Sequence, residues 1–140
     1  MATPAALPRP AALPRPAAVI LDLDGTLVDT VETRIRAWLA VFAEQDIPAT
    51  HAQVAPLIGS DGRFLARAVA EAAGIPLADG RDEVIDRRSG EIYERLNRDP
   101  RPLPGVGGFL DALRTGGVRW AIATSSRRER RRAPARASPP

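Results

Sequence analysis

Residues 17–30 read AAVILDLDGTLVDT, and this stretch carries the information on both the fold and the chemistry. Its first part, 17–23, is a short apolar run of Ala, Val, Ile and Leu with a carboxylate near its end. A run of that length and composition predicts a buried strand. Because side chains alternate along a strand, Asp22 and Asp24 can lie on one side of the chain. At the carboxyl end of a strand they would face the crevice in which open α/β sheets bind ligands.

The segment 22–26, Asp-Leu-Asp-Gly-Thr, combines groups that suit phosphate chemistry. Two carboxylates can hold a hard cation such as Mg²⁺, which prefers oxygen ligands. One carboxylate can also attack phosphorus as a nucleophile while the other transfers protons. Gly25 allows the backbone to turn sharply and approach a phosphate, and Thr26 adds a hydroxyl.

Other structures can begin with the same residues. Asp-Gly is a common hairpin turn, but no second strand pattern follows it here. An EF-hand loop that starts at Asp22 would need Glu at its twelfth position, where the sequence has Thr33. We therefore interpret the segment as catalytic, while surface carboxylates without a function stay open as an alternative.

The sequence after this segment predicts helices. Thr30 is a candidate N-cap for a helix over 31–45, whose apolar residues share one face. Three more helical segments follow, from Thr50 to Gly59, over 61–73 and over 82–97. The apolar stripe predicted for the helix over 61–73 comprises Phe64, Leu65, Ala68, Val69 and Ala72.

A proline-rich linker at 100–104 precedes a fifth helix that starts at Val106 and a second strand over 118–123, which is followed by Thr124. Two strands joined through helices imply a parallel pair and an α/β fold. The intervening helices are too many for one crossover, so they are expected to form a separate helical cap inserted after the first strand.

Composition excludes several classes of protein. The 140 residues include no cysteine and no lysine, which excludes disulfides, thiol catalysis, a Schiff-base lysine and a Walker lysine. The single histidine, His51, cannot build a histidine zinc site, and we interpret it as a surface residue. The net charge of +3 reflects the arginine-rich segment 127–140, because the rest of the chain is mildly acidic.

The first sixteen residues contain AALPRP twice in tandem. Proline fixes φ and removes backbone donors, so residues 1–16 are expected to form an extended, solvated arm rather than a secretory signal. No apolar run approaches the length of a membrane span. These features favour a cytoplasmic protein without a membrane partner.

The stretch AAVILDLDGTLVDT, together with PLPGVGGFLDALRTGGVRWAIATSS, resembles motifs one and two of the haloacid dehalogenase-like phosphohydrolases. The resemblance runs from about residue 18 to residue 126. It implies an α/β fold with a partial Rossmann-like core over 17–29 and 101–126. It also implies Mg²⁺ and a helical cap over 30–100, of the phosphoglycolate phosphatase and β-phosphoglucomutase type.

The resemblance implies roles for individual residues. Asp22 would be the nucleophile that forms an aspartyl-phosphate, and would give Mg²⁺ a carboxylate oxygen. Asp24 would be the general acid and base, and would give Mg²⁺ its backbone carbonyl. The groups implied to bind the phosphate of a small phosphorylated metabolite are Gly25, Thr26, Thr124 and Ser125.

The cap would select the substrate through residues that face the cleft. The candidates are Asp29, Arg34, Gly59 and Arg63. A guanidinium at Arg34 or Arg63 could bind an anionic group through two hydrogen bonds, although a solvated helix arginine is the simpler interpretation of each. Mutases of this family carry a histidine where this chain has Arg34, which favours a phosphatase over a mutase.

Two further motifs of the family are not recognisable in this sequence. The third motif is a Lys or occasionally Arg, and the fourth is an acidic pair, both normally placed after motif two. After Ser126 the chain reads RRERRRAPARASPP, without apolar periodicity. We therefore expect a C-terminally truncated or frame-shifted chain with a marginally stable core. The alternative functions are an inactive remnant and, with less support, a basic segment that binds an anion or nucleic acid.

Overall fold

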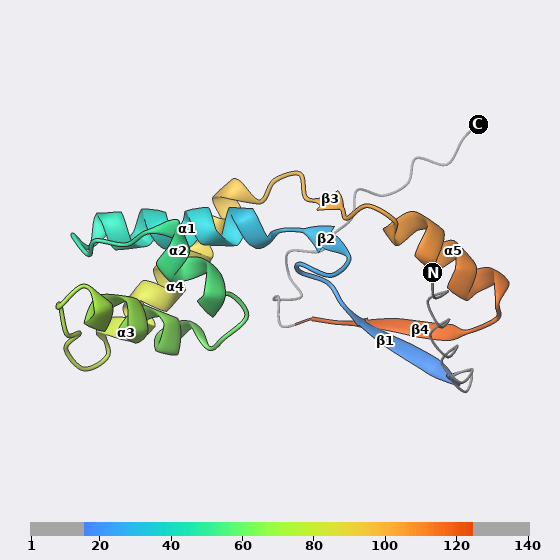
Figure 1. Cartoon of the computed structure of the whole chain (residues 1–140), viewed down its shortest axis with the longest axis horizontal. Helices are drawn as coiled ribbons and strands as arrows, with labels where there is room; N and C mark the ends of the chain where they lie inside the picture. The colour runs from blue at the N-terminus through green and yellow to red at the C-terminus, as the bar shows by residue number, and fades with distance from the viewer. Residues whose placement is uncertain (1–15, 125–140) are drawn as a thin grey trace, which may run out of the picture.

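The computed structural model describes residues 16–124. Within this range the chain forms two parts, which we call the helical lobe (α1 to α4) and the sheet lobe (β1, β4 and α5) (Figure 1). The expected arm before residue 16, Ser125, and the arginine-rich segment 127–140 lie outside the described residues. The mixed architecture confirms the predicted α/β class.

The sheet lobe is built on two parallel strands. Strand β1 (Ala18–Asp22) pairs with β4 (Arg119–Ala123) in a register that runs from Ala18 opposite Arg119 to Asp22 opposite Ala123. The predicted parallel pairing of the two strands is therefore confirmed. Because parallel strands point the same way, their carboxyl ends lie at one edge of the sheet.

The prediction that the first strand is buried is wrong for most of its length. Leu21 is buried, but Ile20 is 75% exposed and every residue of β4 is exposed. Apolar composition predicts burial only when other elements cover both faces of a sheet. Among the described residues, α5 (Val106–Thr115) is the helix of the sheet lobe, and it contains no buried residue.

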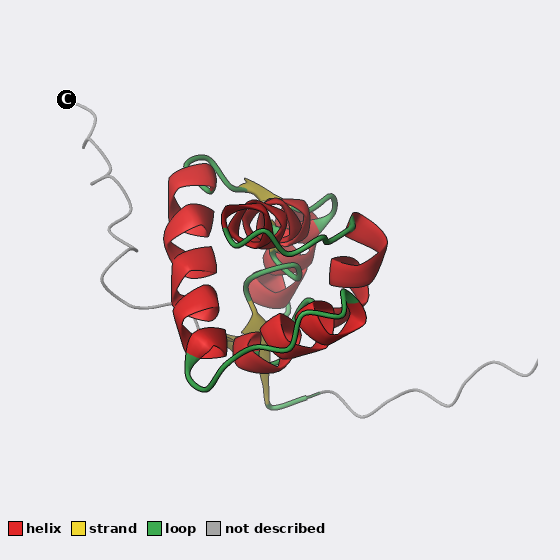
Figure 2. Ribbon diagram, turned by 90° about the vertical axis from the view of Figure 1, so that its left-hand side faces the viewer, coloured by secondary structure: helices red, strands yellow, loops and turns green. Residues whose placement is uncertain are grey.

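The helical lobe follows the predicted order closely. Helix α1 spans Val31–Glu44, and α2 (His51–Val54) continues into the 3₁₀ helix η1 (Ala55–Leu57). Helix α3 covers Gly62–Ala72, and α4 covers Arg81–Leu96. Seen from the end of the molecule, these helices surround a common centre (Figure 2). Each begins and ends close to the predicted limits, since Pro48, Gly59 and Gly74 interrupt the helical pattern.

The hydrophobic core described by the structure lies between α1, α3 and α4. Trp38 and Phe42 stack on α1 with their ring centroids 5.6 Å apart, and Phe42 is fully buried. Fully burying a side chain of this kind stabilises the fold by about 1.5–3 kcal/mol. The further members of this core include Val41, Val54, Leu65, Ala66, Val69, Ala70, Ile85, Ile92 and Tyr93.

The stripe predicted for α3 is wrong at two positions. Phe64 is 54% exposed and Ala72 is also exposed, whereas Ala66 and Ala70 are fully buried. The buried face of α3 is therefore rotated about the helix axis relative to the prediction, and it contains the small residues Ala66 and Ala70. Alanine allows α3 to approach α4 closely, and the bulky Phe64 lies outside the buried face.

A short antiparallel ribbon joins the two lobes, and the sequence did not predict it. Strand β2 (Val28–Asp29) pairs with β3 (Arg101–Pro102), and the amide of Leu103 donates to the carbonyl of Leu27 at 3.1 Å. The proline-rich composition around β3 is typical of a linker, but proline is tolerated at a strand edge. The two crossings between the lobes consequently lie side by side (Figure 1).

Candidate active site

The loop after β1 is tightly closed on itself. The carbonyl of Leu23 accepts from the amides of Leu27 at 2.9 Å and Val28 at 3.0 Å, and the amide of Gly25 donates to Val28 at 2.9 Å. Gly25 has φ +75°, and a Cβ at this position would lie 2.8 Å from Cγ2 of Val31. Glycine is therefore required at this position for two reasons, its backbone conformation and its close approach to α1.

The strand register determines which predicted residues share an edge of the sheet. Asp22 is exposed at the end of β1 and lies opposite Ala123, so that Thr124 follows at the same edge. Thr26 is exposed in the loop that follows. This arrangement gathers an accessible carboxylate and two hydroxyl-bearing residues around the carboxyl end of the two strands.

Asp24 is held by a residue that the sequence analysis did not assign to the site. The Tyr93 hydroxyl donates to Oδ1 of Asp24 at 3.1 Å, and Nδ2 of Asn97 donates to the Tyr93 oxygen at 2.8 Å. Tyr93 and Asn97 lie at the end of α4, far from Asp24 in the sequence. In the sequence, Tyr93 stands among the apolar positions of a predicted helix. A tyrosine in that position normally indicates only a core residue whose hydroxyl needs a hydrogen-bond partner.

Arg34 joins the same cluster. Its guanidinium carbon lies 3.6 Å from the centroid of the Tyr93 ring, a favourable cation–π contact. Burial raises the pKa of the Tyr93 phenol, and the Asp24 carboxylate raises it further, whereas Arg34 and a hydrogen bond with Thr30 lower it. Thr30 occupies the predicted N-cap position of α1, but its buried side chain makes no capping hydrogen bond there.

A second group of charges lies between α3 and α4. Asp86 on α4 sits against Gly62, since a Cβ on that glycine would lie 1.8 Å from Oδ1 of Asp86. Burial raises the pKa of Asp86, as does Asp61, while Arg34 and Arg63 lower it. Two of the four cap candidates are therefore near enough to one carboxylate to act on it together. Asp86 itself was missed because an acidic residue on a charged helix face is normally solvated.

The cap candidates differ in how the structure places them. Arg63 is exposed and lies 3.7 Å from Asp61, whose Oδ1 accepts a hydrogen bond from the Phe64 amide at the N-terminus of α3. Gly59 adopts φ +94° in the loop before α3, with open space around it. Asp29 is exposed on β2, opposite Arg101. Within residues 16–124, no interaction draws Gly59 or Asp29 toward the Tyr93 cluster.

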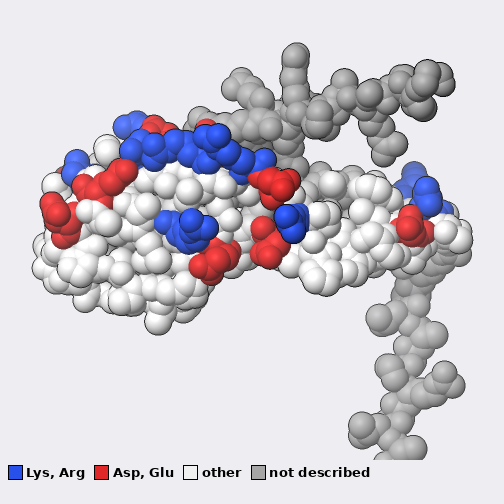
Figure 3. Space-filling view, turned by 90° about the horizontal axis from the view of Figure 1, so that it is seen from above, with Lys and Arg blue, Asp and Glu red and all other residues white. Residues whose placement is uncertain are grey.

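Several surface charges pair with one another away from this cluster. Arginine side chains gather along one edge of the helical lobe, with carboxylates beside them (Figure 3). Arg88 bonds Glu44 at 2.8 Å and Glu91 at 2.9 Å, and its guanidinium lowers the pKa of Glu44. Exposed His51 lies 3.1 Å from Glu32, which agrees with its interpretation as a surface residue. Such exposed pairs stabilise a fold only slightly.

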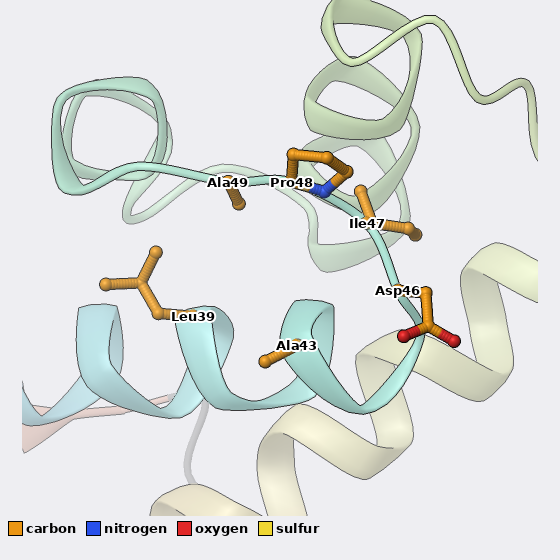
Figure 4. A pocket seen from close by; sticks show the side chains of 6 residues that line it. All are labelled: Leu39, Ala43, Asp46, Ile47, Pro48 and Ala49. Carbon is orange, nitrogen blue, oxygen red and sulfur yellow. The ribbon is translucent and has the colours of Figure 1, made fainter.

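A shallow hollow of about 420 Å³ lies at the other end of α1 from Arg34 (Figure 4). It is lined by Leu39, Ala43, Asp46, Ile47, Pro48 and Ala49. One carboxylate among apolar side chains offers little to a phosphorylated ligand. The hollow is therefore separate from the candidate active site in both position and chemistry.

The donors around Asp22 and Asp24 suit Mg²⁺ in type. An exposed carboxylate and a backbone carbonyl supply oxygen ligands, and Mg²⁺ in proteins commonly binds one or two carboxylates together with water and substrate phosphate. Within the described range, no three Asp, Glu, His or Cys side chains come together as a metal site. No helix of that range has the length and apolar character needed to cross a bilayer.

Residues 19–133 match the family of haloacid dehalogenase-like hydrolases, and the chain belongs to this family. It is 31% identical over 109 residues to a phosphoglycolate phosphatase of Caulobacter vibrioides, a match that covers 76% of this chain and 46% of the relative. A β-phosphoglucomutase of Bacillus subtilis is 28% identical over 120 residues, covering 79% and 51%.

Solved structures agree with the sequence comparisons. A hydrolase from Pseudomonas syringae superposes with a TM-score of 0.64 at 30% identity, covering 79% of this chain and 49% of that one. The two-stranded parallel sheet and the helices therefore match part of the Rossmann-like fold of this family. The chain spans about half the length of the curated relatives it matches.

Proposed function

We propose that this chain acts as a phosphohydrolase that removes phosphate from a small phosphorylated metabolite through an aspartyl-phosphate. The observation that carries the proposal is the register of β1 and β4, which brings the exposed Asp22 carboxylate to the same edge as Thr124. Membership of the family supports it, as do the phosphatases among the relatives.

In the proposed reaction an Asp22 oxygen attacks phosphorus, and the bond from phosphorus to the leaving oxygen breaks. Asp24 gives its proton to that oxygen and then takes a proton from water, which attacks the phosphorus of the aspartyl-phosphate. Inorganic phosphate departs and the Asp22 carboxylate is restored. Gly25 would let the backbone approach the phosphate, and donors from Thr26, Thr124 and Ser125 would hold the phosphoryl oxygens, since positioning supplies much of the catalysis in phosphoryl transfer.

Asp22, through its carboxylate, and Asp24, through its backbone carbonyl, would hold Mg²⁺ in this proposal. Bound there, the cation would neutralise charge on the phosphate and on the carboxylate that approaches it. The described residues supply these two oxygen donors and leave further ligand positions to water and substrate.

We further propose that residues 30–100 act as the cap that selects the substrate. Arg34 is the best placed of the four candidates, because its contact with Tyr93 connects it to Asp24. Arg63 and Arg34 both lower the pKa of Asp86 through their positive charges. A guanidinium at the Arg34 position suits an anionic substrate group and lacks the neutral acid–base form that histidine would provide, which favours a phosphatase over a phosphomutase.

Hydrolysis of p-nitrophenyl phosphate by the full chain tests the proposal. Turnover is expected with Mg²⁺, and it should disappear with EDTA and in Asp22→Asn. Asp111→Asn is the matched control, because Asp111 is an exposed carboxylate on α5 that pairs with Arg114 at 3.0 Å, and it should retain turnover. A folded wild-type chain without turnover would reject the proposed activity and support the inactive alternative.

A further inference from the structure

We propose that Tyr93 is a positioning residue that fixes the orientation of the Asp24 carboxylate and thereby connects α4 to the loop after β1. The inference rests on the proposed function, because it assigns Asp24 the proton transfers described above. It concerns a residue of the helical lobe that acts through Asp24 and need not touch the substrate.

The direction of each hydrogen bond follows from the chemistry of the groups. The Asn97 Nδ2 amide can only donate, so the Tyr93 oxygen accepts that bond at 2.8 Å. The phenol has a single hydrogen, which is then directed to Oδ1 of Asp24 at 3.1 Å. Asn97 is the C-cap residue that follows α4, four positions after Tyr93, and its backbone amide also donates to the Tyr93 carbonyl. The two bonds together leave the phenol one orientation.

The ring of Tyr93 is held as firmly as its hydroxyl. Tyr93 is 8% exposed and belongs to the core of the helical lobe, and Arg34 lies against its ring at 3.6 Å. Charged groups from two other elements face it, Asp24 from the loop after β1 and Arg34 from α1. A phenol fixed by packing on its ring can restrict rotation of the carboxylate that accepts its hydrogen.

The consequence for catalysis is geometric. A carboxylate that serves as both acid and base must present one oxygen to the leaving group and then to water, and a misplacement of about 1 Å can reduce a rate substantially. Tyr93 restrains one oxygen of Asp24 from a lobe that lies outside the sheet. The position of the helical lobe and the orientation of Asp24 are therefore linked through one hydrogen bond.

The spectroscopic test uses the fact that Tyr93 is the single tyrosine of the chain. Tyrosine labelled with ¹³C at Cζ gives one signal from the full-length protein at pH 7. Asp24→Ala removes the acceptor, so the signal should move upfield, while Asp22→Ala should leave it in place. If Asp24→Ala unfolds the chain, Asp24→Asn should give a smaller upfield shift. A signal that ignores both changes at Asp24 would overturn the inference.

The kinetic test uses Tyr93→Phe, which removes only the hydroxyl. We expect kcat for p-nitrophenyl phosphate to fall by about tenfold while KM stays within about twofold, the pattern of a misdirected proton transfer. Unchanged kcat in a Tyr93→Phe protein with native circular dichroism would overturn the inference. A wild-type chain without turnover would reject the proposed function alone, and the ¹³C signal would still decide whether Tyr93 holds Asp24.

Discussion

Gly25 and Val31 approach each other so closely that the loop after β1 and the first turn of α1 leave no room for a side chain between them. A Cβ on Gly25 would lie 2.8 Å from Cγ2 of Val31. The β-branched Val31 has few rotamers available on a helix, so it cannot easily move aside. The position of the helical lobe relative to Asp24 therefore depends on a glycine in the loop between them.

Gly25→Ala is expected to destabilise the chain more than Gly80→Ala. Both glycines have φ +75°, but no heavy atom lies within 4 Å of a Cβ on Gly80. Alanine in this conformation costs about 1–2 kcal/mol at either site, and overpacking against Val31 should add about 1–3 kcal/mol. Urea unfolding followed by tryptophan fluorescence measures the difference. Equal destabilisation by the two variants would show that the contact with Val31 has no energetic effect.

Phe42 and Phe64 form a matched pair for the core. Phe42 is fully buried and stacks on Trp38, whereas Phe64 is 54% exposed although the sequence pattern predicted it inside. Phe42→Ala should lower the free energy of unfolding by about 3–5 kcal/mol, which is a large fraction of the stability of a small domain. Phe64→Ala should change it by less than about 1 kcal/mol. Thermal melting followed by circular dichroism at 222 nm compares them, and a reversed order would contradict the described packing of α3.

Asp86→Asn should stabilise the chain at neutral pH. Burial raises the pKa of Asp86 above the usual value of an Asp side chain, so the folded state binds a proton there more tightly than the unfolded state does. The ionised Asp86 therefore weakens the fold at pH values above its folded pKa. That penalty decreases as the pH falls through the folded pKa, and it is absent once the carboxyl is protonated in both states.

The measurement is the difference in Tm between Asp86→Asn and wild type across a pH series, with Asp111→Asn as the exposed control. The advantage of Asp86→Asn should be largest at neutral pH and should vanish below about pH 4, near the ordinary pKa of an Asp side chain. An advantage that stays constant with pH would show that the substitution acts through packing rather than through charge.

Local patterns in the sequence predicted the order and limits of the main elements well. Helix α1 and strand β4 follow from periodicity and from glycine or proline stops, which are local properties. The exposure of Ile20 could not be predicted in the same way, because burial depends on which elements cover a sheet. The β2–β3 ribbon could not be predicted from the sequence, because Pro102 is typical of a linker rather than of a strand.

The candidate site also contains a part that local sequence predicts and a part that depends on contacts between distant residues. Asp22, Asp24 and Gly25 stand in one contiguous motif, so their grouping was predictable from the sequence. The contact between Tyr93 and Asp24 joins positions 69 apart, and no local pattern contains it. Arg34 was predicted as a site residue without the partner that positions it, because its contact with Tyr93 depends on how α1 packs against α4.

The β2–β3 ribbon makes the helical lobe an insertion whose two ends lie next to each other, so the whole lobe could be exchanged as one unit. Asp29 and Arg101 are paired across the ribbon, and opposed residues of an antiparallel pair are close enough for a short turn to connect them. The segment between these two residues includes Arg34 and Tyr93. The chain enters it at Asp29 and leaves it at Arg101, at the same place beside the sheet lobe. A different helical segment grafted at the same two residues would keep the sequence of the Asp22–Asp24 loop, but it would have to replace the contacts that Val31 and Tyr93 make with that loop.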